Sequence, residues 1–222
     1  MTLPTPPSNR QPPSRRRWVV AAGAAALVPL PALVLGARAQ GTTQAALRPT
    51  PAQSEGPFYP VELPRDSDAD LLRNGALAYA RGRAAVVEGS VVDLQGRPVR
   101  GAVVDIWQCD ADGRYHHPGD GGRADPAFQG FGRVAVDADG RYRFRTLRPS
   151  PYTGRTPHIH FKVRLGSRDL LTTQLYVEGD PGNERDGLWR SLRDPADRAA
   201  LTVPFRPDGE GYAATFGIVV RA

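Results

Sequence analysis

Short segments in which apolar and polar residues alternate recur from residue 84 onward. Apolar residues at every second position are typical of a strand that buries one face. The pattern predicts seven strands, at residues 84–92, 102–108, 133–136, 141–145, 158–165, 171–177 and 213–220. Turn residues separate these segments, notably Gln95-Gly96-Arg97-Pro98, Asp112-Gly113 and Asp139-Gly140. Seven short strands punctuated in this way favour an all-β fold, specifically a β-sandwich.

One stretch has a helical pattern instead. It runs from Leu188 to Leu201 and is broken at Pro195, because proline removes a helical hydrogen bond. We therefore expect short helical connections and no helical layer.

The first 39 residues have the organisation of an export signal. Arg15, Arg16 and Arg17 precede an apolar stretch that runs to Gly36, and the small-x-small sequence Ala37-Arg38-Ala39 follows. These features predict a twin-arginine signal peptide and a periplasmic or extracellular location. A membrane anchor is the alternative, since the apolar stretch is nearly long enough to span a bilayer. Two prolines within it and the small-x-small site favour cleavage, so we expect no stable membrane anchor.

The remaining chain divides into a linker and a domain. Residues 40–53 are rich in Thr, Gln, Ala and Pro and predict an unstructured linker, and residues 54–222 predict one β-sandwich domain. The net charge of +6 falls to +1 without the leader, which holds five of the 29 basic residues and no acidic residue. The high pI therefore gives no indication of a nucleic-acid partner. The lone Cys109 excludes an intrachain disulfide.

All four histidines lie in two short segments, and each segment contains a tyrosine. His158 and His160 are separated by one residue in a predicted strand, so their imidazoles leave from the same face. Tyr115 and Tyr152 could add phenolate oxygens, and this mixed donor set favours a metal acidic enough to keep tyrosine deprotonated. Ferric iron fits this requirement best.

Simpler interpretations exist for several of these residues. A His-x-His pair on a strand is often a surface pair or a hydrogen-bonded core pair. His116 and His117 also compete as ligands, but adjacent residues in extended chain point oppositely, and a polar rim or surface pair is the favoured interpretation. The Asp-Ala-Asp-Gly runs at 110–113 and 137–140 lack the glutamate and flanking helices of a calcium loop and are interpreted as turns.

Five blocks of this sequence resemble the intradiol ring-cleavage dioxygenases, which include protocatechuate 3,4-dioxygenase and catechol 1,2-dioxygenase. They span about 125 residues in the family's order. The blocks are Glu55-Gly56-Pro57-Phe58-Tyr59, residues 101–108 running on to Tyr115, Phe144-Arg145-Thr146, Tyr152–His160 and Gln174–Asp180.

The resemblance implies a role for each matching residue. Tyr115, Tyr152, His158 and His160 correspond to the four protein ligands of a ferric ion. Tyr152 corresponds to the tyrosinate that leaves when the substrate binds and accepts a substrate proton, while the other three ligands stay. Arg155 matches the arginine beside the substrate, and Gln174 matches a pocket glutamine. Tyr59, Trp107, Phe161 and Tyr176 are expected in the core or the pocket wall.

The resemblance also implies a fold and an activity. The family fold is a β-sandwich with the iron held between the sheets, and its members cleave a catechol ring between the two hydroxylated carbons with O₂, giving a muconate-type diacid. Only five residues separate Tyr152 from His158, fewer than in the protocatechuate and catechol enzymes, which leaves the identity of the catechol open. A homo-oligomer is compatible with the family.

Two other classes of protein would account for part of the pattern. A cupin-like ferrous or copper oxidase also uses His-x-His but needs a later histidine, and none follows His160. A secreted β-sandwich binding module with a non-catalytic metal site is the non-enzymatic alternative. The complete set of two tyrosines, two histidines and Arg155 argues against it.

Overall fold

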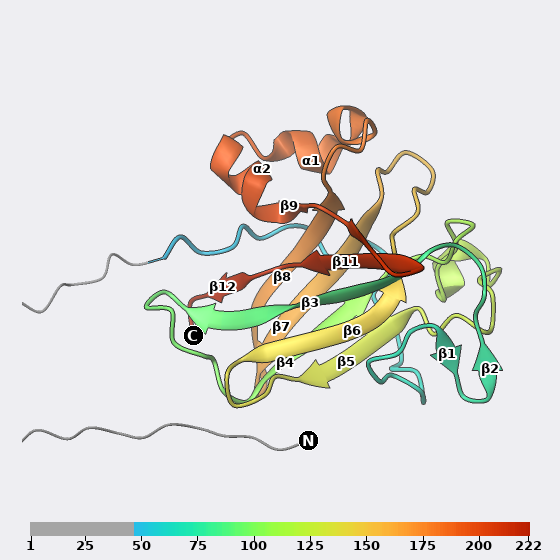
Figure 1. The fold of residues 1–222 in the computed structure, drawn as a ribbon, viewed down its shortest axis with the longest axis horizontal. Coiled ribbons are helices and arrows are strands. Elements are labelled where there is room, and N and C mark those ends of the chain that lie inside the picture. The colour runs from blue at the N-terminus through green and yellow to red at the C-terminus, as the bar shows by residue number, and fades with distance from the viewer. Residues whose placement is uncertain (1–46) are drawn as a thin grey trace, which may run out of the picture. The chain divides into compact units, whose positions relative to one another are not determined.

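Two five-stranded sheets form the body of the structure, for which a computed structural model describes residues 47–222 (Figure 1). The first sheet has the order β10–β11–β3–β12, and β6 also pairs with β3. Its strands are β3 (Ala84–Asp93), β6 (Arg141–Leu147), β10 (Arg206–Asp208), β11 (Gly211–Thr215) and β12 (Ile218–Val220). The second sheet has the order β5–β4–β7–β8–β9. Its strands are β4 (Ala102–Trp107), β5 (Phe131–Ala135), β7 (His158–Leu165), β8 (Arg168–Val177) and β9 (Thr202–Val203).

The remaining elements are short. A small hairpin joins β1 (Arg73–Asn74) to β2 (Leu77–Ala78), and two 3-10 turns, η1 and η2, cover Pro118–Asp120 and Asn183–Arg185. Helices α1 (Gly187–Ser191) and α2 (Pro195–Leu201) lie in the connection between β8 and β9, with Pro195 as the first residue of α2. The predicted all-β fold and its short helical connections are therefore confirmed.

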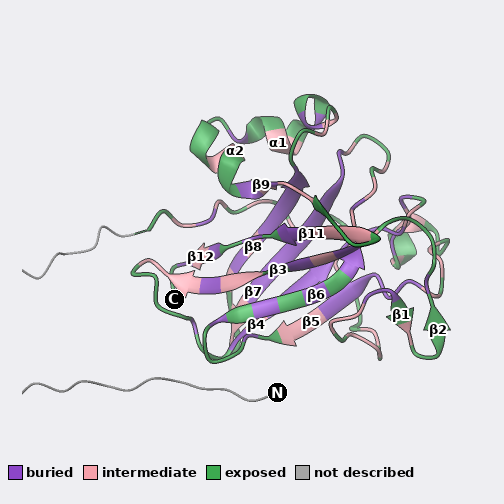
Figure 2. Ribbon diagram, viewed as in Figure 1, coloured by how far each residue is buried: buried purple, intermediate pink, exposed green. Residues whose placement is uncertain are grey.

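The core between the sheets follows from the alternation of the strands. Val87 and Phe144 of the first sheet and Ile106 and Phe161 of the second belong to one buried apolar cluster. The Phe161 ring of β7 lies 6.0 Å from the Tyr142 ring of β6, so the two sheets are in direct contact. Figure 2 shows the same alternation of buried and exposed residues along β6.

The last predicted strand, residues 213–220, is divided in the structure. Strands β11 and β12 both pair in parallel with β3, and the chain between them approaches Gly89 closely. A Cβ atom on Gly89 would lie 1.9 Å from the Phe216 carbonyl oxygen, so only glycine permits this approach. The division of the strand thus depends on a glycine in another strand.

The predicted leader, residues 1–39, and residues 40–46 of the predicted linker lie outside the described residues. Residues 47–53 form no helix or strand but are hydrogen-bonded to the domain through Leu47, Thr50 and Gln53. No helix within residues 47–222 is long and apolar enough to cross a bilayer. The two Asp-Ala-Asp-Gly runs are confirmed as turns: Asp110 and Asp137 each accept hydrogen bonds from the N–H groups two and four residues later.

Candidate metal centre

Strand β7 is buried on both faces, and the two faces have different chemistry. Ile159, Phe161 and Val163 belong to the apolar core between the sheets, whereas His158 and His160 lie on the opposite face. The neighbouring strands divide in the same way. Trp107 of β4 and Gln174 of β8 pair with His160 and lie on the same face of the sheet as His160. One face of the second sheet is therefore apolar and the other carries the candidate site.

This arrangement corrects the expected position of the site between the sheets. The histidines lie on the outer face of the second sheet, and aromatic residues from the end of β4 and from loops surround them. Trp107 and Tyr115 belong to a buried cluster separate from the main core, against which Phe58 and Tyr152 pack. The chain segment around Phe58 thus forms a second layer over this face, which shields the site without using the first sheet.

The two histidines present nitrogen atoms to the same point. Their Nε2 atoms lie 3.1 Å apart, and both side chains are buried. The His158 Nδ1 atom lies 2.7 Å from the Thr156 carbonyl, so Nδ1 donates a proton and Nε2 carries the lone pair. Two nitrogens each about 2.0–2.1 Å from one metal ion, at roughly a right angle, would be about 3 Å apart. The observed separation fits this requirement.

Burial keeps both imidazoles neutral. It lowers the pKa of His158 to about 4, with a smaller contribution from the Arg155 charge. Burial also lowers the pKa of His160 well below its ordinary value, and His158 and Arg155 lower it further. Neutral imidazoles with free lone pairs are the form that binds a metal ion.

The two tyrosines complete the candidate ligand set. The Tyr115 and Tyr152 rings lie 5.3 Å apart, and they lie 6.1 Å from His160 and 5.4 Å from His158 respectively. The Tyr115 hydroxyl is buried and has no hydrogen-bond partner within residues 47–222. Phe58 stacks on Tyr115 at 4.5 Å and isolates it further from water. A buried oxygen without a partner costs free energy unless a ligand or ion satisfies it.

The chemistry of the donors fits a strongly Lewis-acidic cation. Burial raises the pKa of both phenols, and the charge of Arg155 offsets this effect only in part, for Tyr115 as for Tyr152. Both phenols would therefore keep their protons at neutral pH unless a cation stabilised the phenolates. Within residues 47–222, no cluster of three or more His, Cys, Asp or Glu could hold a metal ion. A metal at His158 and His160 must accordingly draw on the tyrosines.

Arg155 places a fixed positive charge beside Tyr152. Its Nε atom donates to Asp186 at 2.7 Å, Nη2 donates to Gln174 at 2.6 Å, and Nη1 lies 3.4 Å from the Tyr152 hydroxyl. The Gln174 amide is oriented in turn by donating from Nε2 to the Ser54 carbonyl. The guanidinium is thus held on two sides, with its third nitrogen toward the site.

The other two histidines are used by the backbone. His116 Nε2 lies 2.5 Å from the Phe128 carbonyl, and His117 Nδ1 accepts a hydrogen bond from the Gly119 N–H. These contacts agree with the prediction that Tyr115, and neither His116 nor His117, belongs to the metal site.

Three supporting contacts were not predicted from the sequence, although Trp107 itself was expected in the core or the pocket wall. Trp107 stacks on His160, with ring centroids 4.7 Å apart and planes 9° apart. Asp186 binds Arg155 and also caps α1 by accepting from the N–H groups of Leu188 and Trp189. The capping position of Asp186 is a recognisable sequence signal, but its contact with Arg155 is not. The Thr156 carbonyl, which fixes the His158 tautomer, has no sequence signal at all.

The chain is similar to known dioxygenases over most of the described domain. A family model described as "Dioxygenase" matches residues 54–221. The protocatechuate 3,4-dioxygenase beta chain of Burkholderia cepacia is 38% identical over 181 residues, covering 74% of this chain and 76% of that protein. The hydroxyquinol 1,2-dioxygenase of Corynebacterium glutamicum is 34% identical over 182 residues, covering 72% of this chain but only 58% of that protein.

A solved structure shares the fold. The dioxygenase domain of a dioxygenase carbohydrate-binding protein fusion from Streptomyces sp. SirexAA-E is 34% identical, with a TM-score of 0.62. The match covers 78% of this chain and 97% of that domain.

Proposed function

The chain belongs to the intradiol dioxygenase family, and from this premise we propose that it is a ferric-iron enzyme that opens a catechol ring between the two hydroxylated carbons. In this reaction O₂ adds both of its atoms to the ring carbons, the bond between those carbons breaks, and a muconate-type diacid forms. The observation that carries the proposal is the buried set of two neutral histidines and two tyrosines beside the fixed charge of Arg155.

His158, His160, Tyr115 and Tyr152 would hold the iron. A bound ferric ion would supply the Lewis acidity that keeps the phenols ionised and draws electron density from the catecholate. The histidines are suited to this role because burial holds them neutral and the Thr156 carbonyl fixes the tautomer of His158. Stacking on Trp107 holds the plane of the His160 ring.

The two tyrosines differ in a way that suits different roles. Tyr115 is buried beneath Phe58, whereas Tyr152 is only half-buried and faces Arg155. The Tyr152 oxygen can therefore take up a substrate proton at an accessible position, while Tyr115 stays enclosed. Arg155 stabilises negative charge on Tyr152 and on the adjacent substrate without itself titrating.

The substrate class follows from the family, and the names of the relatives suggest specific compounds. Protocatechuate and hydroxyquinol are the substrates named for two relatives, and catechol is named for others. A non-catalytic binding module is the weaker alternative, because such a protein has no need for Arg155 to be held by both Asp186 and Gln174.

Iron content, colour and oxygen uptake test the proposal together. The purified domain should contain about one iron per chain and be red, because phenolate-to-ferric charge transfer absorbs visible light. It should consume one O₂ per catechol and release a diacid. His160→Ala should lose the iron, whereas His117→Ala, a histidine outside the site, should keep it. Colourless protein with stoichiometric zinc, or red protein that takes up no O₂ with any catechol, would contradict the proposal.

A further inference from the structure

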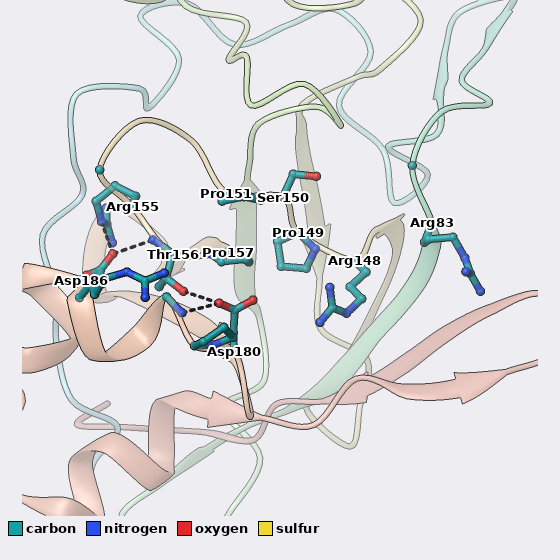
Figure 3. Close-up of a pocket in the computed structure, with 15 residues that line it drawn as sticks. Arg83, Arg148, Pro149, Ser150, Pro151, Arg155, Thr156, Pro157, Asp180 and Asp186 are labelled. Carbon is teal, nitrogen blue, oxygen red and sulfur yellow. Dashed lines mark hydrogen bonds and ion pairs between the residues drawn. The ribbon is translucent and has the colours of Figure 1, made fainter.

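A cavity lies beside the loop that carries Tyr152 and Arg155 (Figure 3). Its volume is about 600 Å³, and none of the four candidate iron ligands lines it. Three segments distant in sequence form its walls: residues 82–83 before β3, residues 148–151 and 154–157 between β6 and β7, and residues 180–182 and 185–186 after β8. Arg155 belongs to both the cavity wall and the candidate metal centre. We refer to this cavity as the arginine groove.

Three arginines of the groove have no acidic partner. Arg83, Arg148 and Arg185 line it, and none forms an ion pair with a carboxylate within residues 47–222. Arg83 and Arg148 are held together, since both guanidinium groups lie over the Tyr212 ring, at 5.2 and 5.6 Å from its centroid. Stacking on an aromatic ring orients a guanidinium but leaves its N–H donors free.

The two aspartates of the groove do not neutralise these arginines. The buried Asp186 accepts hydrogen bonds from Arg155 and from the backbone N–H groups of Thr156, Leu188 and Trp189. Asp180 accepts hydrogen bonds from the Gly182 N–H and the Thr156 hydroxyl (Figure 3). With four arginines and two aspartates, the groove has an excess of positive charge and free donors for an anion.

The rest of the lining indicates the chemical class of that anion. Four prolines, at positions 149, 151, 157 and 181, present flat apolar surfaces between the charged groups. A small hydrated inorganic ion would gain nothing from such walls, whereas an organic acid can place its carbon skeleton on the prolines and its carboxylate on the arginines. The volume lies in the range of about 300–1,000 Å³ that is typical of organic ligand sites.

We propose that the arginine groove binds the carboxylate group of an organic acid. The identity of the acid rests on the proposed function. Because Arg155 separates the groove from Tyr152, the acid belongs to the reaction at the metal centre: it is either the ring-opened diacid product or a catechol that carries a carboxylate. Both acids would present a carboxylate to Arg83, Arg148 and Arg185.

Direct titration tests the groove without turnover. Cis,cis-muconate and protocatechuate are titrated calorimetrically, with O₂ excluded so that no ring cleavage occurs, into the iron-loaded protein and into the double variant Arg83→Gln/Arg148→Gln. We expect the double variant to bind at least one of the two acids about tenfold more weakly, because charge-assisted hydrogen bonds are lost. Arg168→Gln is the matched control. Arg168 lies at the far end of β8, whose ten residues span about 30 Å, so this variant should bind both acids with the affinity of the parent. An unchanged melting temperature in each variant shows that the fold is intact.

Steady-state kinetics distinguish the two sources. If the groove binds the substrate's carboxylate, KM for protocatechuate should rise about tenfold in the double variant while KM for catechol stays constant. If it binds the product, both KM values should stay constant and inhibition by muconate should weaken about tenfold. If the parent and the double variant bound both acids equally well, the proposal that the arginine groove binds a carboxylate would be wrong. Retained acid binding without oxygen uptake on any catechol would instead contradict the proposed function alone.

Discussion

Two buried arginine–aspartate pairs flank the candidate metal centre, and they differ in what the arginine does with its remaining donors. Arg133 pairs with Asp105 at 2.6 Å on one side, and Arg155 pairs with Asp186 at 2.7 Å on the other. Neither aspartate side chain is exposed. By residue type, distance and burial the two pairs are nearly the same.

The two pairs differ in the hydrogen bonds that each arginine donates. Arg133 binds Asp105 through two nitrogens, at 2.6 and 2.7 Å, and within residues 47–222 its one further side-chain hydrogen bond goes to the Tyr59 hydroxyl at 3.4 Å. Arg155 gives Asp186 a single nitrogen and turns the other two toward Gln174 and Tyr152. A guanidinium whose N–H donors are occupied by its paired carboxylate has a structural role. A guanidinium that keeps N–H donors for other groups can act on a site.

The largest effect is expected on stability, from Asp105→Ala. This change leaves Arg133 in a part-buried position without its carboxylate and also removes the acceptor of the Tyr59 hydroxyl. Breaking a buried pair in this way costs about 3–5 kcal/mol, which urea denaturation of the iron-loaded protein would measure. The turnover of the remaining folded protein should change little. A loss of stability below about 1 kcal/mol would show that the pair is not structural.

Replacing both partners sharpens the same test. In Asp105→Leu/Arg133→Met no charge is left unpaired, so most of the stability should return. A double variant as unstable as Asp105→Ala would assign the loss to packing instead of charge.

The next effect is expected on turnover, from Arg155→Ala. Removing a fixed charge beside developing negative charge costs about 2.7–4 kcal/mol, a decrease in rate of at least a hundredfold. Iron content should be unchanged, since Arg155 is no ligand. Arg155→Lys keeps the charge but cannot contact Asp186, Gln174 and Tyr152 together, so it should recover only part of the rate. If iron-loaded Arg155→Ala turned over substrate at the parent rate, Arg155 would have only a structural role, like Arg133.

The comparison also shows where sequence analysis succeeds and where it stops. Strand β7 was predicted at residues 158–165 and is observed there, because its alternation is strong and Pro157 precedes it. The shared orientation of His158 and His160 follows from the same period of two. Which face they occupy does not follow, because residues 158–163 are buried on both sides and burial alone cannot distinguish core from site.

The contacts that hold Arg155 and Arg133 were beyond prediction for a different reason. Asp186 is 31 residues from Arg155 and Asp105 is 28 residues from Arg133, and the fold alone brings them together. The residues alone indicate a mixed site of histidines and tyrosines, but the complete set of candidate ligands and the role of each one came from the family resemblance, since no spacing in the sequence connects Tyr115 with His158. The leader at residues 1–39 stays a prediction.

The smallest effect is expected from Asp186→Asn, and its pH dependence tests the second pair. Burial acts to raise the pKa of Asp186, but hydrogen bonds from the Trp189 and Thr156 N–H groups and from Arg155 outweigh it, so the pKa lies below its ordinary value. A carboxyl group with a lowered folded-state pKa stabilises the protein fully above the unfolded value of about 3.9 and loses that contribution as the pH falls through the folded value.

The stability difference between parent and Asp186→Asn should therefore be constant from about pH 5 to 8, at roughly 1–3 kcal/mol, and shrink below about pH 4. Urea denaturation at a series of pH values measures it. Acid-driven loss of iron affects both proteins alike, because both keep the same four ligands, so it cancels in the difference. A difference that shrinks already between pH 8 and 5 would mean that Asp186 is protonated in that range, and Arg155 would then lack the fixed partner that orients it toward Tyr152.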